Sequence, residues 1–269
     1  MSDIQPSVII TGAGRGIGRE IARVFAAADY WMTLVARSRS ELEATTAELP
    51  PDRCRIVPAD IAQPADCQKV VAAALDLSGQ INVLINAAGL LGAIGPFWET
   101  SPEGWKQAIE VNLLGSVQLM RLAIPLLHLT RGAIVNFAGG GDGPMAQFSA
   151  YSASKAALIR FTETSAEELR PLGIRVNIVA PGVVRTQMLD QVLAVHPRMA
   201  QPSRAVSGAS SAVGSARPVA ELCLFLASET ARPLTGKYIS AVWDDWRNWT
   251  QEQIAAIAVG DRLTLRRQK

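Results

Sequence analysis

The stretch VIITGAGRGIGREIA, Val8 to Ala22, decides the fold class of this chain. It begins as a short apolar strand and passes through a glycine-rich loop into a helical pattern. Glycine permits the tight turn and lets the backbone approach a pyrophosphate, and a helix N-terminus offers unpaired N–H groups to phosphates. A glycine cluster is often an ordinary turn, but its position between strand and helix predicts a dinucleotide site. We expect the site to contain Gly12, Gly14, Arg15, Gly16, Ile17 and Gly18.

Short apolar runs alternate with helical patterns along the rest of the chain. Strands are predicted at residues 8–11, 31–36, 55–59, 83–86, 133–137, 175–179 and 238–242. Helices are predicted near residues 16–28, 40–48, 64–76, 102–129, 150–170 and 218–228. Buried strands separated by helices indicate an α/β fold with a parallel sheet covered on both faces and right-handed crossovers. We expect a single domain, residues 1–243, with an irregular stretch at 187–217 that serves as a substrate lid and a tail at 244–269.

Composition excludes several classes of protein. The chain has 269 residues, 49% hydrophobic and 19% charged, which is typical of a globular domain. Its formal charge of +2 is dispersed, so no nucleic-acid partner is expected. The three cysteines and two histidines show no metal-ligand spacing, so no metal site is expected. No signal peptide is recognisable, and Asn, Gly and Pro interrupt the uncharged run at 81–98; we expect a cytoplasmic protein without a membrane span.

The end of the second predicted strand bears on the choice of cofactor. A site that prefers NAD often has an acid there to bind the ribose hydroxyls. This chain has Arg37 and Ser38 instead, and Arg15 lies in the glycine loop. Exposed arginines can merely solvate a loop, but a guanidinium fork also suits a 2′-phosphate. We therefore expect NADP(H) rather than NAD(H).

Tyr151 and Lys155 are four residues apart and share one face of a predicted helix. An ammonium about 4 Å from the phenol contributes roughly 4 kcal/mol at an effective dielectric near 20. It would lower the tyrosine pKa, although desolvation opposes this effect. A tyrosine tuned in this way can donate a proton to a carbonyl that receives hydride, or accept one from an alcohol. An isolated pair of this kind is usually a surface feature; the nucleotide motif favours the catalytic interpretation.

Six motifs in the same order resemble the short-chain dehydrogenase/reductase family across residues 8–242. They are TGAGRGIG at 11–18, Asp60, NAAG at 86–89, Asn112, YSASK at 151–155 and PGVVRT at 181–186. The resemblance implies a doubly wound Rossmann fold with a seven-stranded parallel sheet, and cofactor and substrate at the carboxyl edge of the strands. It implies a small-molecule substrate and a homodimer or homotetramer built from the helices at 102–129 and 150–170.

The resemblance also implies roles for individual residues. Tyr151 and Lys155 would be catalytic, and Asn112 would support a water chain that leads to the lysine. The remaining positions expected near the cofactor are Asp60, Ile61, Asn86, Ala87, Gly89, Pro181, Gly182, Val184 and Thr186, with Tyr151 and Lys155 as well. Asn86 can equally be a buried amide that ties strands together.

One departure from the family lies upstream of the tyrosine. Members commonly carry a serine about thirteen residues before it, whose hydroxyl binds the substrate oxygen. Counting back reaches Ala138, and aligning on the strand reaches Gly139; neither has a hydroxyl. Loss of one such donor costs about 2.7–4 kcal/mol.

Three explanations for this departure stay open. In the first, another donor takes the place of the serine, with Asp142 or a glycine N–H of residues 139–141 as candidates. In the second, the reaction needs less help at the oxyanion, as with an imine acceptor. Alternatively, the chain binds NADP(H) with little or no turnover. We expect an NADP(H)-dependent oxidoreductase that interconverts a carbonyl and an alcohol, with Ala138, Gly139 and Asp142 at the substrate position.

The tail is a second departure. The sequence WDDWRNW at 243–249 stands where the family usually has a glycine-containing turn. Its aromatic and acidic residues could line a pocket for a polyhydroxylated substrate, but packing against the core or an interface is the favoured interpretation.

Overall fold

The computed structural model describes residues 5–139, 144–195 and 213–265. Within them, seven strands form one sheet in the order β3-β2-β1-β4-β5-β6-β7, and every neighbouring pair is parallel. The strands are β1 (Ser7–Thr11), β2 (Trp31–Ala36), β3 (Cys54–Pro58), β4 (Val83–Asn86), β5 (Ala133–Phe137), β6 (Arg175–Ala180) and β7 (Tyr238–Ser240). The chain reverses its direction across the sheet between β3 and β4, which makes a topological switch point beside β1. The predicted doubly wound fold and the seven strands are confirmed.

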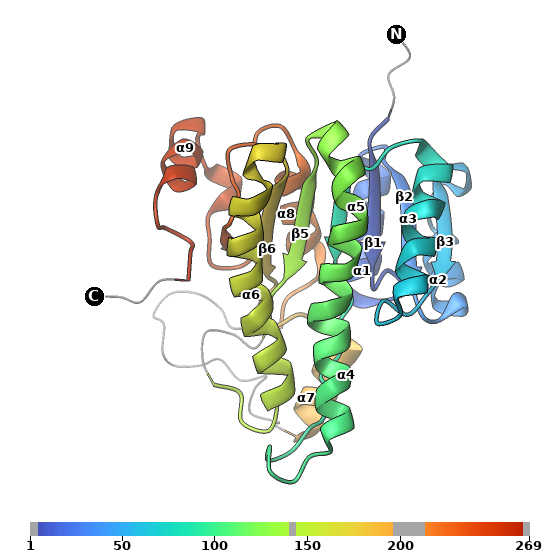
Figure 1. Cartoon of the computed structure of the whole chain (residues 1–269), viewed down its shortest axis with the longest axis vertical. Coiled ribbons are helices and arrows are strands. Elements are labelled where there is room, and N and C mark those ends of the chain that lie inside the picture. The colour runs from blue at the N-terminus through green and yellow to red at the C-terminus, as the bar shows by residue number, and fades with distance from the viewer. Residues whose placement is uncertain (1–4, 140–143, 196–212, 266–269) are drawn as a thin grey trace.

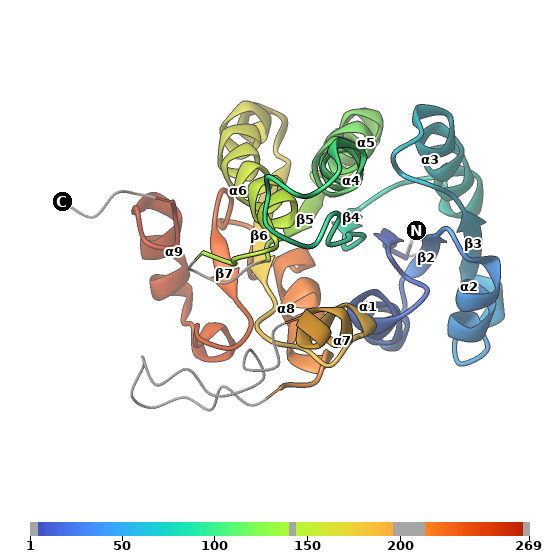
Figure 2. The same cartoon turned by 90° about the horizontal axis from the view of Figure 1, so that it is seen from below.

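Helices cover both faces of the sheet (Figure 2). They are α1 (Gly16–Ala27), α2 (Arg39–Thr46), α3 (Pro64–Ser78), α4 (Pro102–Ile109), α5 (Ser116–Thr130), α6 (Ser149–Leu169), α7 (Gln187–Val195), α8 (Arg217–Ala227) and α9 (Gln251–Val259). Alternate residues of each strand face opposite layers: Ile10 packs in the layer with α1 and α8, and Ile9 in the layer with α3 and α5. Apolar residues on both faces of a strand are what a fully covered parallel sheet requires.

The helix predicted at 102–129 is interrupted by a π-helical turn. Residues Glu110–Gly115 have π geometry and lie between α4 and α5, with Asn112 fully buried inside the turn. Length and composition alone would let the run Pro102–Thr130 cross a membrane. Core helices of other folds meet the same length and composition criterion. Leu119 and Leu127 of this run are fully buried in the layer that also contains α3.

The stretch predicted as irregular at 187–217 is helical at its start. Helix α7 occupies Gln187–Val195, so this part of the prediction is wrong. Thr186 Oγ1 accepts a hydrogen bond from Leu189 N at 3.2 Å and so caps the first turn. The apolar spacing of Met188 and Val192 lets the helix pack beside Tyr151. Residues 196–212 of the predicted lid lie outside the described residues.

The tail packs against the sheet layer and then closes its edge. Trp246 is buried, and its ring lies 5.7 Å from that of Phe225 in α8, centroid to centroid. Beyond α9, which lies outside β6 in Figure 1 and beside β7 in Figure 2, the chain returns along the sheet. Tyr238 N donates to Leu263 O at 2.8 Å, and Lys237 Nζ donates to Gly260 O at 2.7 Å. The packing interpretation therefore describes Trp246, while the outer edge of β7 is covered by the chain's own tail. Trp243 and Asp244 instead line a cavity at the carboxyl ends of the strands, as the pocket interpretation expects.

Candidate active site

A cavity of about 2250 Å³ opens at the carboxyl ends of the central strands. It is large enough for a dinucleotide together with a substrate. The predicted residues that line it are Gly12, Gly14, Arg15, Gly16, Ile17, Gly18, Arg37, Ser38, Asp60, Ile61, Ala87, Gly89, Ala138, Gly139, Tyr151, Lys155, Pro181, Gly182, Val184 and Thr186. Asn86 and Asn112 are buried behind the cavity wall, and Asp142 lies outside the described residues.

The glycine loop is as tight as its sequence predicts. Gly12 has φ +69°, and a Cβ there would lie 3.0 Å from the backbone of Ala87 and Ala88. Thr11 Oγ1 accepts a hydrogen bond from Ala88 N at 3.0 Å, which ties the loop to the segment after β4. The backbone can therefore approach a pyrophosphate closely, so the loop fits the dinucleotide that the sequence implies.

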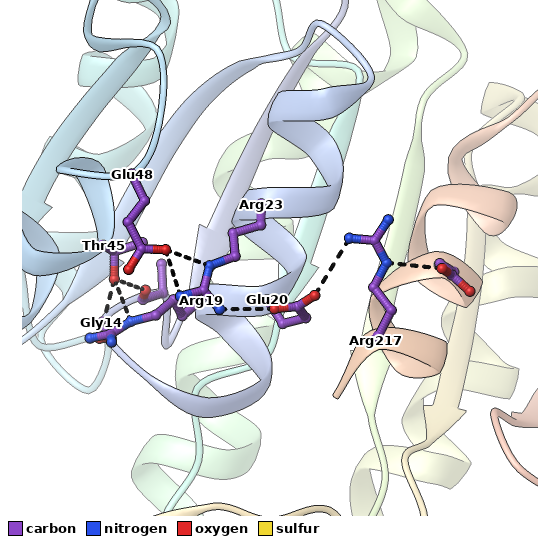
Figure 3. A network of polar contacts seen from close by, with 9 residues as sticks. Gly14, Arg19, Glu20, Arg23, Thr45, Glu48 and Arg217 are labelled. Carbon is purple, nitrogen blue, oxygen red and sulfur yellow. Dashed lines mark hydrogen bonds and ion pairs between the residues drawn. The ribbon is translucent and has the colours of Figure 1, made fainter. Parts of the chain in front are cut away.

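Side chains of α1 and α2 hold the carbonyl side of this loop (Figure 3). Arg19 Nη2 donates to Gly14 O at 2.5 Å. Thr45 Oγ1 lies 3.0 Å from Ala13 O and 3.2 Å from Gly14 O, and it also accepts from Arg19 Nε at 3.0 Å. Because side chains of Arg19 and Thr45 satisfy these carbonyls, the N–H groups at the start of α1 are available to bind an anion.

The adenosine-ribose end contains a carboxylate that sequence reasoning missed. Arg15 Nη1 donates to Glu41 Oε1 at 3.1 Å and also to Gln187 Oε1. Ser38 caps α2 by accepting from Glu41 N at 3.2 Å, which turns Glu41 back toward the glycine loop. The S-x-x-E spacing of a capping box was the available signal. Arg37 is exposed and forms no ion pair with any residue that the structure describes.

Tyr151 and Lys155 line the cavity, and Asn112 lies buried behind them. Lys155 Nζ donates to Phe137 O at 2.8 Å. Asn112 Oδ1 accepts from Leu90 N, and its Nδ2 donates to Ser154 Oγ, both at 2.9 Å. A Cβ on Gly89 would lie 3.2 Å from Asn112 Oδ1 and 3.5 Å from Lys155 Nζ. The lysine and the asparagine therefore both lie close to this glycine.

Burial shifts the pKa values of Tyr151 and Lys155. It raises the pKa of Tyr151 to about 12 and lowers the pKa of Lys155 to about 8. The expectation that Lys155 lowers the tyrosine pKa is therefore wrong for this structure, because the lysine is bound to Phe137 O and desolvation dominates. The phenol is protonated at neutral pH and suits a proton donor.

Gly139, not Ala138, faces the tyrosine. Ala138 packs in an apolar cluster with Leu158 and Ile178. A Cβ on Gly139 would lie only 1.9 Å from Tyr151 Oη. The hydroxyl of Tyr151 thus lies against the position where a serine side chain would begin.

An apolar wall, which the sequence did not reveal, adjoins the tyrosine. Leu91, Phe148, Tyr151 and Val192 form one buried cluster, and Met145 packs against it. These residues come from three separate segments, around Leu91, at 145–151 and in α7, so no local pattern could have assembled them.

The structure supports the buried-amide interpretation of Asn86. Its Nδ2 donates to Asn136 Oδ1 at 2.9 Å, and Asn136 Nδ2 donates to Thr162 Oγ1 at 2.9 Å. This chain of bonds ties β4 and β5 to α6. Asn136 was missed; an amide within the apolar run AIVNF was the signal. In the described ranges, no group of three His, Cys, Asp or Glu residues could hold a metal ion.

Comparison with known proteins gives consistent matches. Residues 6–195 match the family described as short chain dehydrogenase. The protein 11-beta-hydroxysteroid dehydrogenase-like 3 of Arabidopsis thaliana is 36% identical over 185 residues, 67% of this chain and 60% of that protein. L-fucose dehydrogenase of Mus musculus is 32% identical over 226 residues, 82% of either chain. A Brucella melitensis crystal structure of a short-chain dehydrogenase/reductase titled glucose/ribitol dehydrogenase matches with TM-score 0.79 and 32% identity, covering 87% of this chain and 94% of that one.

Proposed function

Because the chain belongs to the short-chain dehydrogenase/reductase family and is an NAD(P)-dependent oxidoreductase, we propose that it interconverts a carbonyl and an alcohol, with NADP(H) as cofactor and Tyr151 as acid/base. The observation that carries the proposal is the placement of Tyr151 in the cavity beside the glycine loop, with Lys155 and Asn112 behind it.

The cofactor, when bound, supplies or accepts the hydride. The glycine loop and the start of α1 would hold its pyrophosphate, and Asp60 would lie near the adenine. Arg37 and Arg15 would bind the 2′-phosphate, which requires Arg15 to exchange its bond to Glu41 for the phosphate. Glu41 could instead accept hydrogen bonds from ribose hydroxyls, the interaction that favours NAD(H). The exposed Arg37, which no described carboxylate pairs, favours NADP(H).

Tyr151 performs the proton transfer. Its phenol is protonated at neutral pH and can donate to a carbonyl oxygen placed against it. In the opposite direction the phenolate accepts the alcohol proton. The N–H of Gly139 donates to none of the described residues and is the best-placed replacement for the serine hydroxyl.

We propose an apolar carbonyl compound as the substrate. The cavity wall beside Tyr151 contains Leu91, Val192 and Met145, which offer no hydrogen bonds from their side chains to sugar hydroxyls, and Phe148 packs behind it. Of the two named relatives, the hydroxysteroid dehydrogenase-like protein is therefore the better guide to substrate than the L-fucose dehydrogenase.

The test is turnover of a panel of apolar ketones and of free sugars, followed by the nicotinamide absorbance with NADPH and NADH. The proposal expects reduction of apolar ketones with NADPH, lost in Tyr151→Phe while cofactor binding remains. Cofactor binding without turnover of any panel member would instead favour a non-catalytic NADP(H)-binding protein.

The assembly and location remain proposals as well. Leu114 and Leu129, 51% and 78% exposed, lie on the helical run from α4 to α5 and would contribute to a homodimer or homotetramer interface together with α6. We further propose that residues 187–217, beginning with α7, act as a lid over a small-molecule substrate, and that the protein is cytoplasmic with neither a nucleic-acid nor a membrane partner. Light scattering and localisation of a tagged chain test these points.

A further inference from the structure

A second cavity, of about 500 Å³, lies at the opposite ends of the strands from the active site. It forms where the end of α5, the turn before β6 and the turn before β7 meet. Four arginines line it: Arg131, Arg170, Arg175 and Arg232. None of its lining residues belongs to the wall of the active-site cavity. We propose that this second cavity binds a small anion that carries a phosphate group.

Arg175 is the buried part of the site. Arg175 is only 5% exposed. Its guanidinium donates to backbone carbonyls alone: Nη1 to Arg131 O at 3.3 Å, and Nη2 to Ala227 O at 3.0 Å. Its Nε has no hydrogen-bond partner among the described residues. A buried guanidinium with an unmatched donor is costly unless an anion completes it. Glu229, the carboxylate that acts on Arg175, is already paired with Arg232.

The other arginines leave the cavity positively charged. Arg170 pairs with Glu167 at 2.7 Å, and Arg232 pairs with Glu229 at 2.6 Å. Arg131 forms no ion pair in the described part of the chain; it is held by the left-handed end of α5 at φ +49°. Four guanidinium groups against two carboxylates give an excess of two positive charges, which matches a phosphate dianion.

Geometry favours phosphate over other anions. Guanidinium groups present paired N–H donors that fit two oxygens of a phosphate. Arg131 lies next to Arg175, because Arg175 Nη1 donates to the backbone carbonyl of Arg131. The cavity has the size of a small-ligand site rather than of an extended basic groove. The phosphate could belong to a free oxyanion or to a nucleotide, which share this chemistry.

The test is calorimetric titration of inorganic pyrophosphate into the full chain saturated with NADPH, which keeps the probe out of the cofactor site. A parallel titration with AMP distinguishes a simple oxyanion from a nucleotide. We expect saturable binding that weakens at least about tenfold in Arg131→Gln and in Arg232→Gln, the scale of one charged hydrogen bond. Arg53→Gln, which alters an exposed arginine paired with Asp29, should change the affinity less than about twofold.

Absence of saturable binding of either probe would overturn the proposal, as would equal weakening in the Arg53 variant. Arg175 itself is left unchanged because its carbonyl contacts support the fold. Circular dichroism of each variant checks that folding is retained. The outcome is independent of catalysis, since NADPH-dependent turnover is measured separately at the other end of the sheet.

Discussion

At the scale of single residues, the contact between Gly139 and Tyr151 governs the chemistry of the site. The phenol oxygen lies where any larger side chain at residue 139 would place its Cβ. A serine there would have to displace the tyrosine before its hydroxyl could serve. The departure from the family therefore involves the position of Tyr151 against Gly139 as well as the missing serine hydroxyl.

A pair of substitutions at this position separates the two effects. Gly139→Ala should lower turnover because its methyl group displaces Tyr151. Gly139→Ser displaces it equally but restores a donor, so its kcat should exceed that of the alanine variant by about 10²-fold. Steady-state kinetics measures the ratio. Equal rates in the two variants would mean that the reaction needs no hydroxyl at this place.

Ala138→Ser is the matched control. It places a hydroxyl in the apolar cluster of Leu158 and Ile178, so the free energy of unfolding should fall by about 1–3 kcal/mol without a gain in turnover. Urea unfolding and the same kinetic assay check both points.

Arg37 and Glu41 should act in opposite directions on cofactor choice. Arg37→Ala removes a partner of the 2′-phosphate and should weaken NADPH binding about tenfold or more, with little change for NADH. Glu41→Gln frees Arg15 and should strengthen NADPH binding. Fluorescence titration with both cofactors measures the four affinities. NADH binding that exceeds NADPH binding in the parent chain, and stays unchanged in Arg37→Ala, would reverse the assignment.

The residues of the site were predictable to the extent that they lie in local motifs. The glycine loop and the tyrosine–lysine pair are read directly from spacing, and both line the cavity. Glu41 and the apolar wall could not be predicted from spacing, because their position depends on how α2 and α7 are oriented relative to the cavity. The tyrosine pKa was predicted in the wrong direction, because spacing places the lysine nearby but does not reveal that it binds Phe137 O.

At the scale of elements, the link between α1 and α2 holds the glycine loop. Thr45 lies on α2 but contacts the carbonyls of Ala13 and Gly14, and Arg19 joins the same network from α1 (Figure 3). The loop geometry thus depends on a hydroxyl that is more than thirty residues away in sequence.

Thr45→Val should expose this dependence. The change keeps the side-chain shape but removes the hydroxyl, so the free energy of unfolding should fall by about 1–3 kcal/mol, and cofactor affinity should fall more than kcat. Thr46→Val is the control, because Thr46 Oγ1 contacts only carbonyls of its own helix. Thermal unfolding and cofactor titration of both variants give the comparison; equal losses would show that the loop does not rely on Thr45.

Strands were easier to predict than the breaks within helices. Each predicted strand exists within two residues of its position, because a parallel sheet buried on both faces leaves continuous apolar runs. The π turn around Asn112 has no periodic signature, and α7 was obscured by the prolines and small residues that follow it. Tertiary contacts, not local propensity, fix both.

At the scale of the whole molecule, the buried Lys155 links pH to stability. Its pKa is about 8 in the folded chain and 10.5 in an unfolded one, so between these values the unfolded state binds the extra proton. Lys155 therefore contributes a rise in the free energy of unfolding with pH above 8, of roughly 2–3 kcal/mol near pH 10. The raised thiol pKa values of the buried Cys67 and Cys223 and the half-buried Cys54 act in the opposite sense above pH 9. Above pH 10 the raised pKa of Tyr151, about 12, works in the opposite sense.

Urea unfolding of the cofactor-free chain at pH 7, 8, 9 and 10 tests this link. The free energy of unfolding of the parent minus that of Lys155→Met should grow by roughly 2–3 kcal/mol between pH 8 and 10, while Lys69→Met, on the exposed side of α3, should follow the parent. Parallel curves for the parent and Lys155→Met would mean that the lysine stays charged when buried.

The tail is the last part of the described chain, yet it finishes the edge of the sheet. Leu263 reaches the outermost strand only after every strand of the sheet has been synthesised, so a nascent chain carries an open edge at β7 until Leu263 has left the ribosome. During that interval the edge can pair with other chains.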